Sequence, residues 1–296
     1  MKILFIYNPV AGQLQIKNNL WSILNYFSSE KKVKLTVHAT QKAKEAYKIV
    51  RKRANKYDKI ICSGGDGTLH EVINGLIKSN YNKTLGYIPA GSVNDFATSL
   101  DLPKDMKKAA ILAMKGKPRK IDIGKFNNEY FLYVAAFGVF TDVSYVTTQE
   151  MKNLLGKVAY FLQGINSLTS MKTYKVKIVV DDSISEDEYI FGMVTNTLSV
   201  GSLYNLSNQD VLLDDGLFEV TLVKAPKDLI ELSNITTYLV SGKGDNDLVK
   251  IFKTNNIEFI FDEQVPWTLD GEYGGDPQNA KIEVMEKAIE IICEEH

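Results

Sequence analysis

Short apolar runs and amphipathic helical stretches alternate along the N-terminal part of the chain. The apolar runs are KILFIY (2–7), KLTVHA (34–39), KIICS (59–63) and LGYIP (85–89), and the helical stretches between them are Ile16–Phe27, Gln41–Ala54 and Thr68–Lys78. Runs this short predict buried strands, and their alternation with helices predicts parallel strands joined by helical crossovers. We therefore expect an open, mostly parallel α/β sheet, in which ligands bind where strands end and helices begin.

The pattern changes after residue 125. Strand-like runs then follow one another, YKVKIVV (174–180), YIFGMVTN (189–196), LFEVTLV (217–223) and IEFIF (257–261), with one strong helical stretch at Lys152–Leu168. This predicts a mostly antiparallel, β-rich second domain. We expect an α/β domain over residues 1–125 and a β-rich domain over 126–282. The last strand pair, KIEVMEKAIEIIC (281–293), fits either domain, so residues 283–296 can complete the first.

Composition and charge narrow the class of protein. The 296 residues are 45% hydrophobic, which is enough for a large core, and a net charge of -1 gives no general attraction to nucleic acid. The two cysteines lack metal-ligand spacing and favour a reduced, cytoplasmic chain. MKILFIYNPV resembles a first strand rather than a signal peptide, and we expect no transmembrane segment because no apolar run is long enough.

The segment ICSGGDGTLHEVINGL (61–76) places Gly64, Gly65, Asp66 and Gly67 between a strand and a helix. Free helix amides beside such a bare backbone can hold phosphate, whereas the alternative is a tight turn with Asp66 as helix N-cap. The segment lacks the Lys-Ser or Lys-Thr pair of a Walker loop, and His70 stands where a dinucleotide fingerprint has its third glycine. Protein kinase signatures are also missing.

Two further loops follow early strands in the same way. They are YNPVAG (7–12) and PAGSVNDFA (89–97), and each has small residues and a bend. Each loop alone fits an ordinary turn. Parallel topology brings all three loops to one edge of the sheet, which favours a binding site there.

Two acidic segments lie in the second half. LLDDG (212–216) is a good turn signal before a strand. In WTLDGEYGG (267–275), Asp270 and Glu272 project from the same face if the segment is extended, so they can act as a carboxylate pair in which one member accepts a proton. The alternative is a polar hairpin turn.

In this order, NPVAG, GGDGTLHEVINGL, GSVNDFA, DIG, LLDDG and LDGE resemble the motifs of the diacylglycerol kinase catalytic family. This family includes the bacterial soluble lipid kinases and is related to the sphingosine kinases. The resemblance runs from Lys2 to about Gly274. The Gly-Gly-Asp-Gly-Thr loop alone is shared with NAD kinases and phosphofructokinases, whereas the ordered set is specific. The resemblance implies an active site in the cleft between the two domains.

The resemblance also implies an ATP site in the first domain. Asp66 would act near the phosphates or their Mg²⁺, and Asn94 and Asp95 would lie beside the transferred group. Two departures from the family pattern are Ala11, where serine is frequent, and Thr98, where arginine is frequent. The implied nucleotide-binding residues are Asn8, Pro9, Val10, Ala11, Gly12, Thr40, Gly64, Gly65, Asp66, Gly67, Thr68, Leu69, His70, Ser92 and Asn94.

For the second domain, the resemblance implies a structural Mg²⁺ held by Asp215 with Leu212 and Leu217. This metal would be linked through water to an acidic network of Asp122 and Asp95. The resemblance favours Glu272 as the acceptor of the lipid hydroxyl proton, with Asp270 as its partner, although the spacing treats the two alike.

The expected function is that of an ATP-dependent lipid kinase that acts on diacylglycerol at the membrane surface. Alternatives are a kinase of a sphingoid or phosphatidylglycerol-like lipid, a kinase of a soluble acceptor such as NAD, and a nucleotide-binding regulator without turnover. An apolar face on Lys152–Leu168 can line a groove for acyl chains or cover a sheet. The basic residues between Lys42 and Lys56 can approach anionic lipids or form a solvated helix face. We expect a cytoplasmic protein, transiently peripheral to the membrane, and the resemblance makes a homodimer plausible.

Overall fold

The computed structural model describes residues 1–91, 94–138, 172–196, 212–241 and 247–294. The chain forms two compact units, one of Met1–Ile121 with Lys287–His296 and the other of Asp122–Glu286. Strands β5 (Lys117–Phe126) and β15 (Asn279–Cys293) each run from one unit into the other.

The sheet of the first unit is parallel, as the sequence predicts. Its strands are β1 (Lys2–Tyr7), β2 (Lys34–Ala39), β3 (Lys59–Gly64) and β4 (Thr84–Pro89), and they lie in the order β2-β1-β3-β4. The end of β15 pairs in parallel with β4 through Ile291 and Leu85. Three of these strands are almost completely buried, which explains their continuous apolar sequences.

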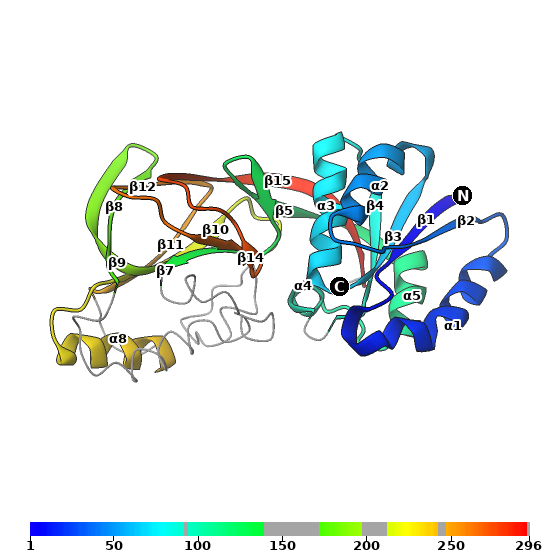
Figure 1. The fold of residues 1–296 in the computed structure, drawn as a ribbon, viewed down its shortest axis with the longest axis horizontal. Coiled ribbons are helices and arrows are strands. Elements are labelled where there is room, and N and C mark those ends of the chain that lie inside the picture. The colour runs from blue at the N-terminus through cyan, green and yellow to red at the C-terminus, as the bar shows by residue number, and fades with distance from the viewer. Residues whose placement is uncertain (92–93, 139–171, 197–211, 242–246, 295–296) are drawn as a thin grey trace. The chain divides into compact units, whose positions relative to one another are not determined.

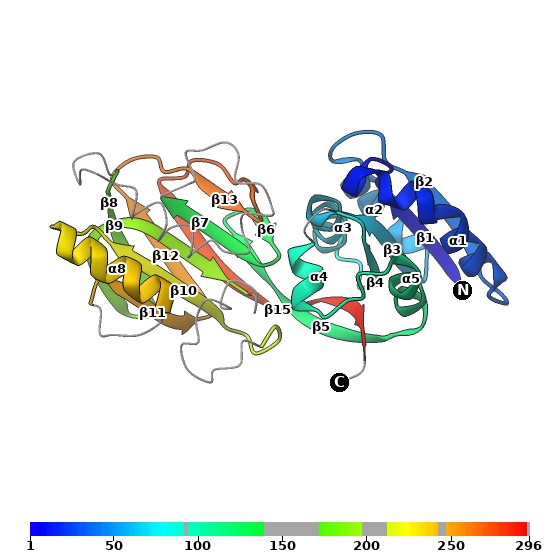
Figure 2. The same cartoon turned by 90° about the horizontal axis from the view of Figure 1, so that it is seen from below.

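Helices cover both faces of this sheet (Figures 1 and 2). On one face lie α1 (Gln15–Ser29) and α5 (Met106–Lys115), whose apolar sides form a core with β1 and β3. On the other face α2 (Glu45–Arg53) packs against α3 (Asp66–Ser79). The shorter elements are η1 (Ala11–Leu14), η2 (Ala54–Lys56) and α4 (Asp95–Ser99).

The predicted helix Gln41–Ala54 is too long at its start, because α2 begins only at Glu45. Lys44 precedes it with a left-handed φ of 62°, a conformation that cannot continue a right-handed helix. Residues 41–44 therefore form a loop.

The second unit is mostly antiparallel, also as predicted (Figure 2). Strands β13, β7, β9, β8, β12 and β15 pair in that order, β10 and β11 extend from β9, and β6 pairs with β5. The bounds are β6 (Glu129–Phe131), β7 (Val134–Gly138), β8 (Tyr174–Val180), β9 (Ser183–Thr195), β10 (Phe218–Lys224), β11 (Val249–Thr254), β12 (Asn256–Phe261), β13 (Trp267–Leu269), β14 (Glu272–Tyr273) and helix α8 (Leu229–Ser241).

An aromatic cluster forms the centre of this unit. The Trp267 ring lies 4.9 Å from that of Phe137 and 5.3 Å from that of Phe259, centroid to centroid. All three side chains are fully buried. Large buried rings contribute heavily to the stability of a sheet, so this cluster fixes the strands that lead to the β13–β14 turn.

Two further sequence predictions differ from the structure. KIEVMEKAIEIIC is a single strand, β15, rather than a strand pair. Lys287 has a left-handed φ of 51° at the point where β15 passes from one unit to the other, and the strand continues through this residue. Helix α8 was not predicted. The predicted helix Lys152–Leu168 lies outside the described residues. Within the described parts, none of the helices has the length and apolar character to span a bilayer.

Candidate active site

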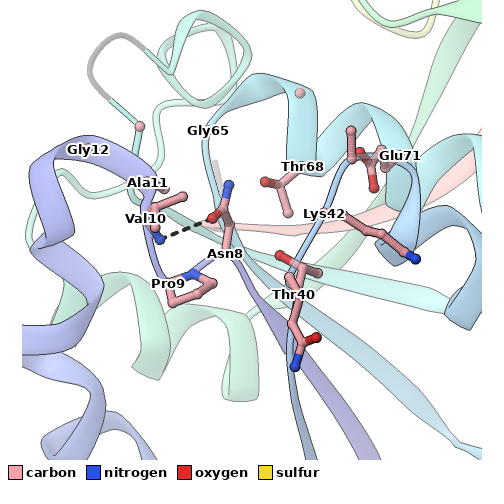
Figure 3. A pocket seen from close by; sticks show the side chains of 14 residues that line it. Asn8, Pro9, Val10, Ala11, Gly12, Thr40, Lys42, Gly65, Thr68 and Glu71 are labelled. Carbon is pink, nitrogen blue, oxygen red and sulfur yellow. Dashed lines mark hydrogen bonds between the residues drawn. The ribbon is translucent and has the colours of Figure 1, made fainter.

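A pocket of about 560 Å³ opens where the strands of the first unit end (Figure 3). Its walls come from the loops after β1, β2, β3 and β4 and from the start of α3. The lining residues are Asn8, Pro9, Val10, Ala11, Gly12, Thr40, Gln41, Lys42, Ala43, Gly65, Gly67, Thr68, Glu71 and Gly91.

Glycines allow the main chains of the loops after β1, β3 and β4 to contact one another. A Cβ on Gly12, whose φ is +50°, would lie 2.0 Å from the carbonyl oxygen of Ala90. A Cβ on Gly91 would lie 2.6 Å from the Cα of Gly65. Side chains at these positions would push the loops apart, so the glycines fix the shape of the pocket floor.

The side chain of Asn94 closes the loop after β4 by bonding to Gly91. Its Oδ1 accepts a hydrogen bond from the Gly91 amide at 2.8 Å, and its Nδ2 donates to the Gly91 carbonyl at 2.8 Å. The Tyr87 hydroxyl, on β4, lies 3.0 Å from the carbonyl oxygen of Gly64 at the end of β3 and 3.3 Å from Asn94 Oδ1, so it links Asn94 to the end of β3. The short polar side chain of Asn94 suits its own left-handed φ of 56°.

Helix α3 starts at the pocket with an uncapped end. Its N-cap is Gly65, which has no side chain to bond the first amides, and Asp66 is the first helical residue. The alternative in which Asp66 is the N-cap is therefore wrong. Because the first amides of a helix lack partners within the helix and lie at its positive end, this arrangement favours an anion. Gly67 and Thr68 line the pocket at this point.

Asp66, the first residue of α3, is buried. Burial raises the pKa of the Tyr87 hydroxyl well above its ordinary value, and the negative charge of Asp66 raises it further. Tyr87 therefore stays protonated and serves as a hydrogen-bond donor to the loop.

The wall formed by residues 40–43 is held by two glutamates. Glu71 accepts hydrogen bonds from the amides of Lys44 at 2.7 Å and Ala46 at 3.1 Å, and it caps the start of α2. Glu45 accepts from the Gln41 amide at 2.7 Å. Its other oxygen lies 3.1 Å from His38 Nε2.

These contacts lower the pKa of Glu45. The hydrogen bond from the Gln41 amide has the largest effect, followed by that from His38. Both favour the ionised carboxylate, so Glu45 stays charged while it holds the wall.

The structure brings together most of the predicted nucleotide-binding residues. Asn8 through Gly12, Thr40, Gly65, Gly67 and Thr68 line the pocket, and Figure 3 shows Asn8, Thr40 and Thr68 around the same space. The other described residues of the predicted set are not lining residues: Gly64 ends β3, Asp66, Leu69 and His70 lie in the first turns of α3, and Asn94 precedes α4. Ser92 lies outside the described residues, as does the side chain of Asp95, the first residue of α4.

Five lining residues were not in the predicted set, namely Gln41, Lys42, Ala43, Glu71 and Gly91. The first three follow the end of β2, where a parallel sheet places its ligands. That position is a signal that the sequence contains, although the predicted set has only Thr40 from this loop.

In the second unit, Asp270 and Glu272 do not lie in one extended segment. Asp270 and Gly271 form a two-residue turn between β13 and β14, with φ angles of 53° and 85°. The expected arrangement on one face of a strand is therefore wrong, and the hairpin alternative describes the local geometry. Asp followed by Gly suits this turn because both central residues need a positive φ.

The carboxylate of Asp270 is buried, and both of its oxygens accept hydrogen bonds from backbone amides. Its Oδ2 accepts from the Leu132 amide at 2.7 Å, and its Oδ1 accepts from the amides of Tyr133 at 3.0 Å and Val134 at 3.2 Å. Asp270 therefore fastens the turn to β7 and the residues before it. Glu272 begins β14 with its side chain exposed to solvent.

The loop of residues 212–217, which we call the acidic loop, leads into β10. Asp215 lies in it with Oδ1 accepting from the Leu217 amide at 3.1 Å and Oδ2 at 3.3 Å from Lys253 Nζ. Asp122 is buried and accepts from the Gly216 amide at 2.7 Å. Leu212 is exposed and Leu217 is half-buried.

In the acidic loop, protein groups occupy the carboxylates that the resemblance assigns to Mg²⁺ and its water network. An ammonium already contacts the Asp215 carboxylate, and Asp122 bonds the loop directly. Across the described part of the chain, no group of three or more His, Cys, Asp or Glu side chains is arranged to hold a metal ion, although the implied site, with a single such side chain, is not of this kind. The predicted site between the two domains stays a prediction.

Comparisons with known proteins agree with the predicted family. Residues 2–126 match the model of the diacylglycerol kinase catalytic domain, and residues 134–293 match that of the YegS C-terminal NAD kinase beta sandwich-like domain. The diacylglycerol kinase of Bacillus subtilis (strain 168) is 37% identical over 273 residues, which cover 91% of this chain and 89% of the relative. The chain belongs to the diacylglycerol kinase family.

Other members of the diacylglycerol kinase family show the same extent of similarity. The diacylglycerol kinase of Staphylococcus carnosus (strain TM300) is 37% identical over 274 residues, covering 91% of this chain and 88% of the relative. A crystal structure of a diacylglycerol kinase from Bacillus anthracis str. Sterne has a TM-score of 0.73 at 27% identity and covers 99% of this chain and 96% of the other. Another structure from the same organism reaches 0.80.

Proposed function

We propose that this chain is an ATP-dependent lipid kinase that transfers the terminal phosphoryl group of ATP to the hydroxyl of diacylglycerol and forms phosphatidic acid. The observation that carries this proposal is the pocket at the uncapped start of α3, in a chain whose family membership extends over both units.

ATP fits the pocket in size and chemistry. A volume of about 560 Å³ lies within the range of roughly 300–1,000 Å³ that is typical of small-molecule sites. We expect the phosphates at the main-chain amides of Gly65–Gly67, where the helix end attracts negative charge; the Thr68 amide already donates to the Gly65 carbonyl at 3.0 Å. Asn8, Thr40 and Thr68 offer polar groups for the rest of the nucleotide.

Magnesium would enter this site with ATP and neutralise charge on the phosphates. Asp66, in the first turn of α3, is a hard oxygen ligand of the kind that Mg²⁺ prefers. We propose Asp66 as the residue that would hold the ion, and the loop amides as the groups that stabilise the charge that develops during transfer.

Glu272 is the proposed proton acceptor. Its carboxylate is exposed and can reach a substrate hydroxyl, whereas both oxygens of Asp270 accept backbone hydrogen bonds. We therefore assign Asp270 a positioning role, in which it holds the turn that presents Glu272. As the lipid oxygen attacks the terminal phosphorus, its proton passes to Glu272, and ADP is the leaving group.

The test is a transfer assay with ATP labelled at the terminal phosphate and Mg²⁺. Diacylglycerol in mixed micelles is compared with sphingosine, phosphatidylglycerol and NAD, the last because the family model of the C-terminal half is described as NAD kinase-like. We expect labelled phosphatidic acid as the main product, identified by mass spectrometry. Preferred transfer to NAD, or ATP binding with no product from any acceptor, would contradict the proposal.

We further propose that the chain works in the cytoplasm at the membrane surface, since diacylglycerol resides in the bilayer and the hydroxyl must reach ATP. Sedimentation with anionic and neutral vesicles measures this association. The proposed homodimer rests on likeness to the bacterial lipid kinases, and analytical ultracentrifugation of the purified chain tests it.

A further inference from the structure

Lys253 connects two acidic residues of the second unit. Strand β11 pairs antiparallel with β10, and this register places Lys253 directly opposite Glu219. The Lys253 ammonium lies 3.2 Å from Glu219 Oε1 and 3.3 Å from Asp215 Oδ2. One positive charge therefore bridges the strand and the acidic loop.

Protein groups also satisfy the polar atoms that shape this loop. The Asp122 amide donates to the Leu213 carbonyl at 2.8 Å, and Asp122 Oδ2 accepts from the Gly216 amide at 2.7 Å. The Leu217 amide bonds the second oxygen of Asp215. Asp122 and the loop are thus joined directly, where the family resemblance implies a metal ion and water.

We propose that Lys253 supplies the positive charge of the acidic loop and that the loop in this chain takes no divalent cation. A metal ion bound by Asp215 would compete with the ammonium for the same carboxylate and would lie within a few ångströms of a like charge. Pairing along the whole of β11 fixes the position of the Lys253 backbone opposite Glu219, which keeps the ammonium within reach of both carboxylates.

Glu219 is the residue through which a metal ion could still enter. Its Oε2 is buried and has no hydrogen-bond partner among the described residues. A divalent ion that reached this oxygen would have to displace Lys253 from Oε1 of the same carboxylate. Metal binding and the Lys253 contacts are therefore alternatives, and an experiment can separate them.

The proposal concerns the folded protein without nucleotide and does not depend on the kinase reaction. Thermal unfolding of the full chain is measured without ATP, in Mg²⁺ and in EDTA. For the wild type we expect midpoints that agree within about 1 °C, because a ligand that does not bind cannot stabilise. Lys253→Met keeps the aliphatic stem but leaves Glu219 and Asp215 uncompensated, and we expect its midpoint in EDTA to fall by about 2–4 °C.

Lys250→Met is the matched control, since Lys250 lies on the same strand and is exposed. It should leave the midpoint unchanged, and an equal fall in both variants would overturn the proposal. Direct metal content, measured after equilibrium dialysis against Mg²⁺ without nucleotide, gives a second readout. We expect close to no bound ion per wild-type chain. About one ion per chain that Asp215→Asn removes would refute the proposal.

Discussion

The glycine loops of the first unit and the acidic turns of the second unit are built in different ways. In the first unit the main chain makes the pocket, and glycines allow the loops after β1, β3 and β4 to touch. In the second unit carboxylates organise the main chain, as Asp270 does with three amides. The first region should therefore be sensitive to added atoms, and the second to lost charge and lost hydrogen-bond acceptors.

The largest expected effect concerns Glu272. Glu272→Gln removes the proposed proton acceptor, so we expect kcat to fall by roughly 10²–10⁴-fold while the Kd for ATP stays the same. Steady-state kinetics and calorimetry measure the two constants. Glu263→Gln, at an exposed carboxylate of the same unit, is the control. Unchanged kcat in Glu272→Gln would remove the second unit's proposed chemical role.

An added methyl group should have the next largest effect. Gly12→Ala would place Cβ against the Ala90 carbonyl at a left-handed φ, so the loops must separate. We expect the Kd for ATP to rise by about 30-fold, which corresponds to about 2 kcal/mol.

Gly275→Ala makes this prediction specific. Gly275 also has a positive φ, of +94°, but its Cβ would meet nothing within 4 Å. The control therefore keeps the backbone strain without the contact between loops, and its ATP affinity should equal that of the wild type. Equal Kd values for Gly12→Ala and the wild type would break the comparison.

Asp270→Asn tests how carboxylates organise the second unit. The change removes the charge and leaves one acceptor oxygen for three amides, so we expect the free energy of unfolding to fall by about 2–3 kcal/mol. Urea unfolding followed by Trp267 fluorescence, in a Trp21→Phe background, reports on this unit because Trp267 is buried in its core.

Asp262→Asn, at an exposed aspartate after β12, should change this free energy by less than about 0.5 kcal/mol. A similar small change in Asp270→Asn would show that the turn does not depend on the buried carboxylate.

Glu71 is an exception in the first unit, because there a carboxylate supports the wall of the pocket. Glu71→Gln keeps one acceptor for the amides of Lys44 and Ala46 and loses the charge at the start of α2. We expect a rise of about 3–10-fold in the Kd for ATP. Glu30→Gln, at a surface ion pair with Lys115, should have no effect on binding. A rise in both variants would point to general charge rather than to the wall.

The smallest expected effect is a pH response at Glu45. Its folded pKa is lowered from 4.5, mainly by the Gln41 amide, so its stabilising contact is fully present above pH 4.5 and is lost as pH falls through the lower folded value. The Gln41 amide signal in two-dimensional NMR should therefore shift only below pH 4.5. Glu45→Gln should abolish this shift, and a Gln41 signal that titrates equally in that variant would assign the response to another group.

Short sequence patterns predict the parallel strands of the first unit and the loops that follow them. The four apolar runs become β1–β4, and the loops that follow them lie together because parallel strands share one carboxyl edge. For Asp270, the preferred prediction was an extended segment with a carboxylate pair, and the hairpin turn that Asp-Gly signals was only the alternative. Helix α8 was not predicted because it contains several β-branched residues, which have a low intrinsic preference for a helix.

Contacts between residues that are far apart in the sequence could not be predicted from it. Glu71 caps α2 from 27 residues away, and Lys253 reaches Asp215 across 38. Neither pair belongs to a periodic pattern, and each exists only because helix packing or strand register brings the partners together.

Hydrogen–deuterium exchange with and without ATP and Mg²⁺ tests whether the nucleotide binds at the glycine loops, since it shows which backbone amides the nucleotide covers. We expect slower exchange in the peptides that contain Asn8–Gly12, Gly65–Thr68 and Gly91, and we expect Gly12→Ala to weaken that protection. Unchanged exchange in these peptides at a saturating ATP concentration, or protection confined to other parts of the chain, would contradict it.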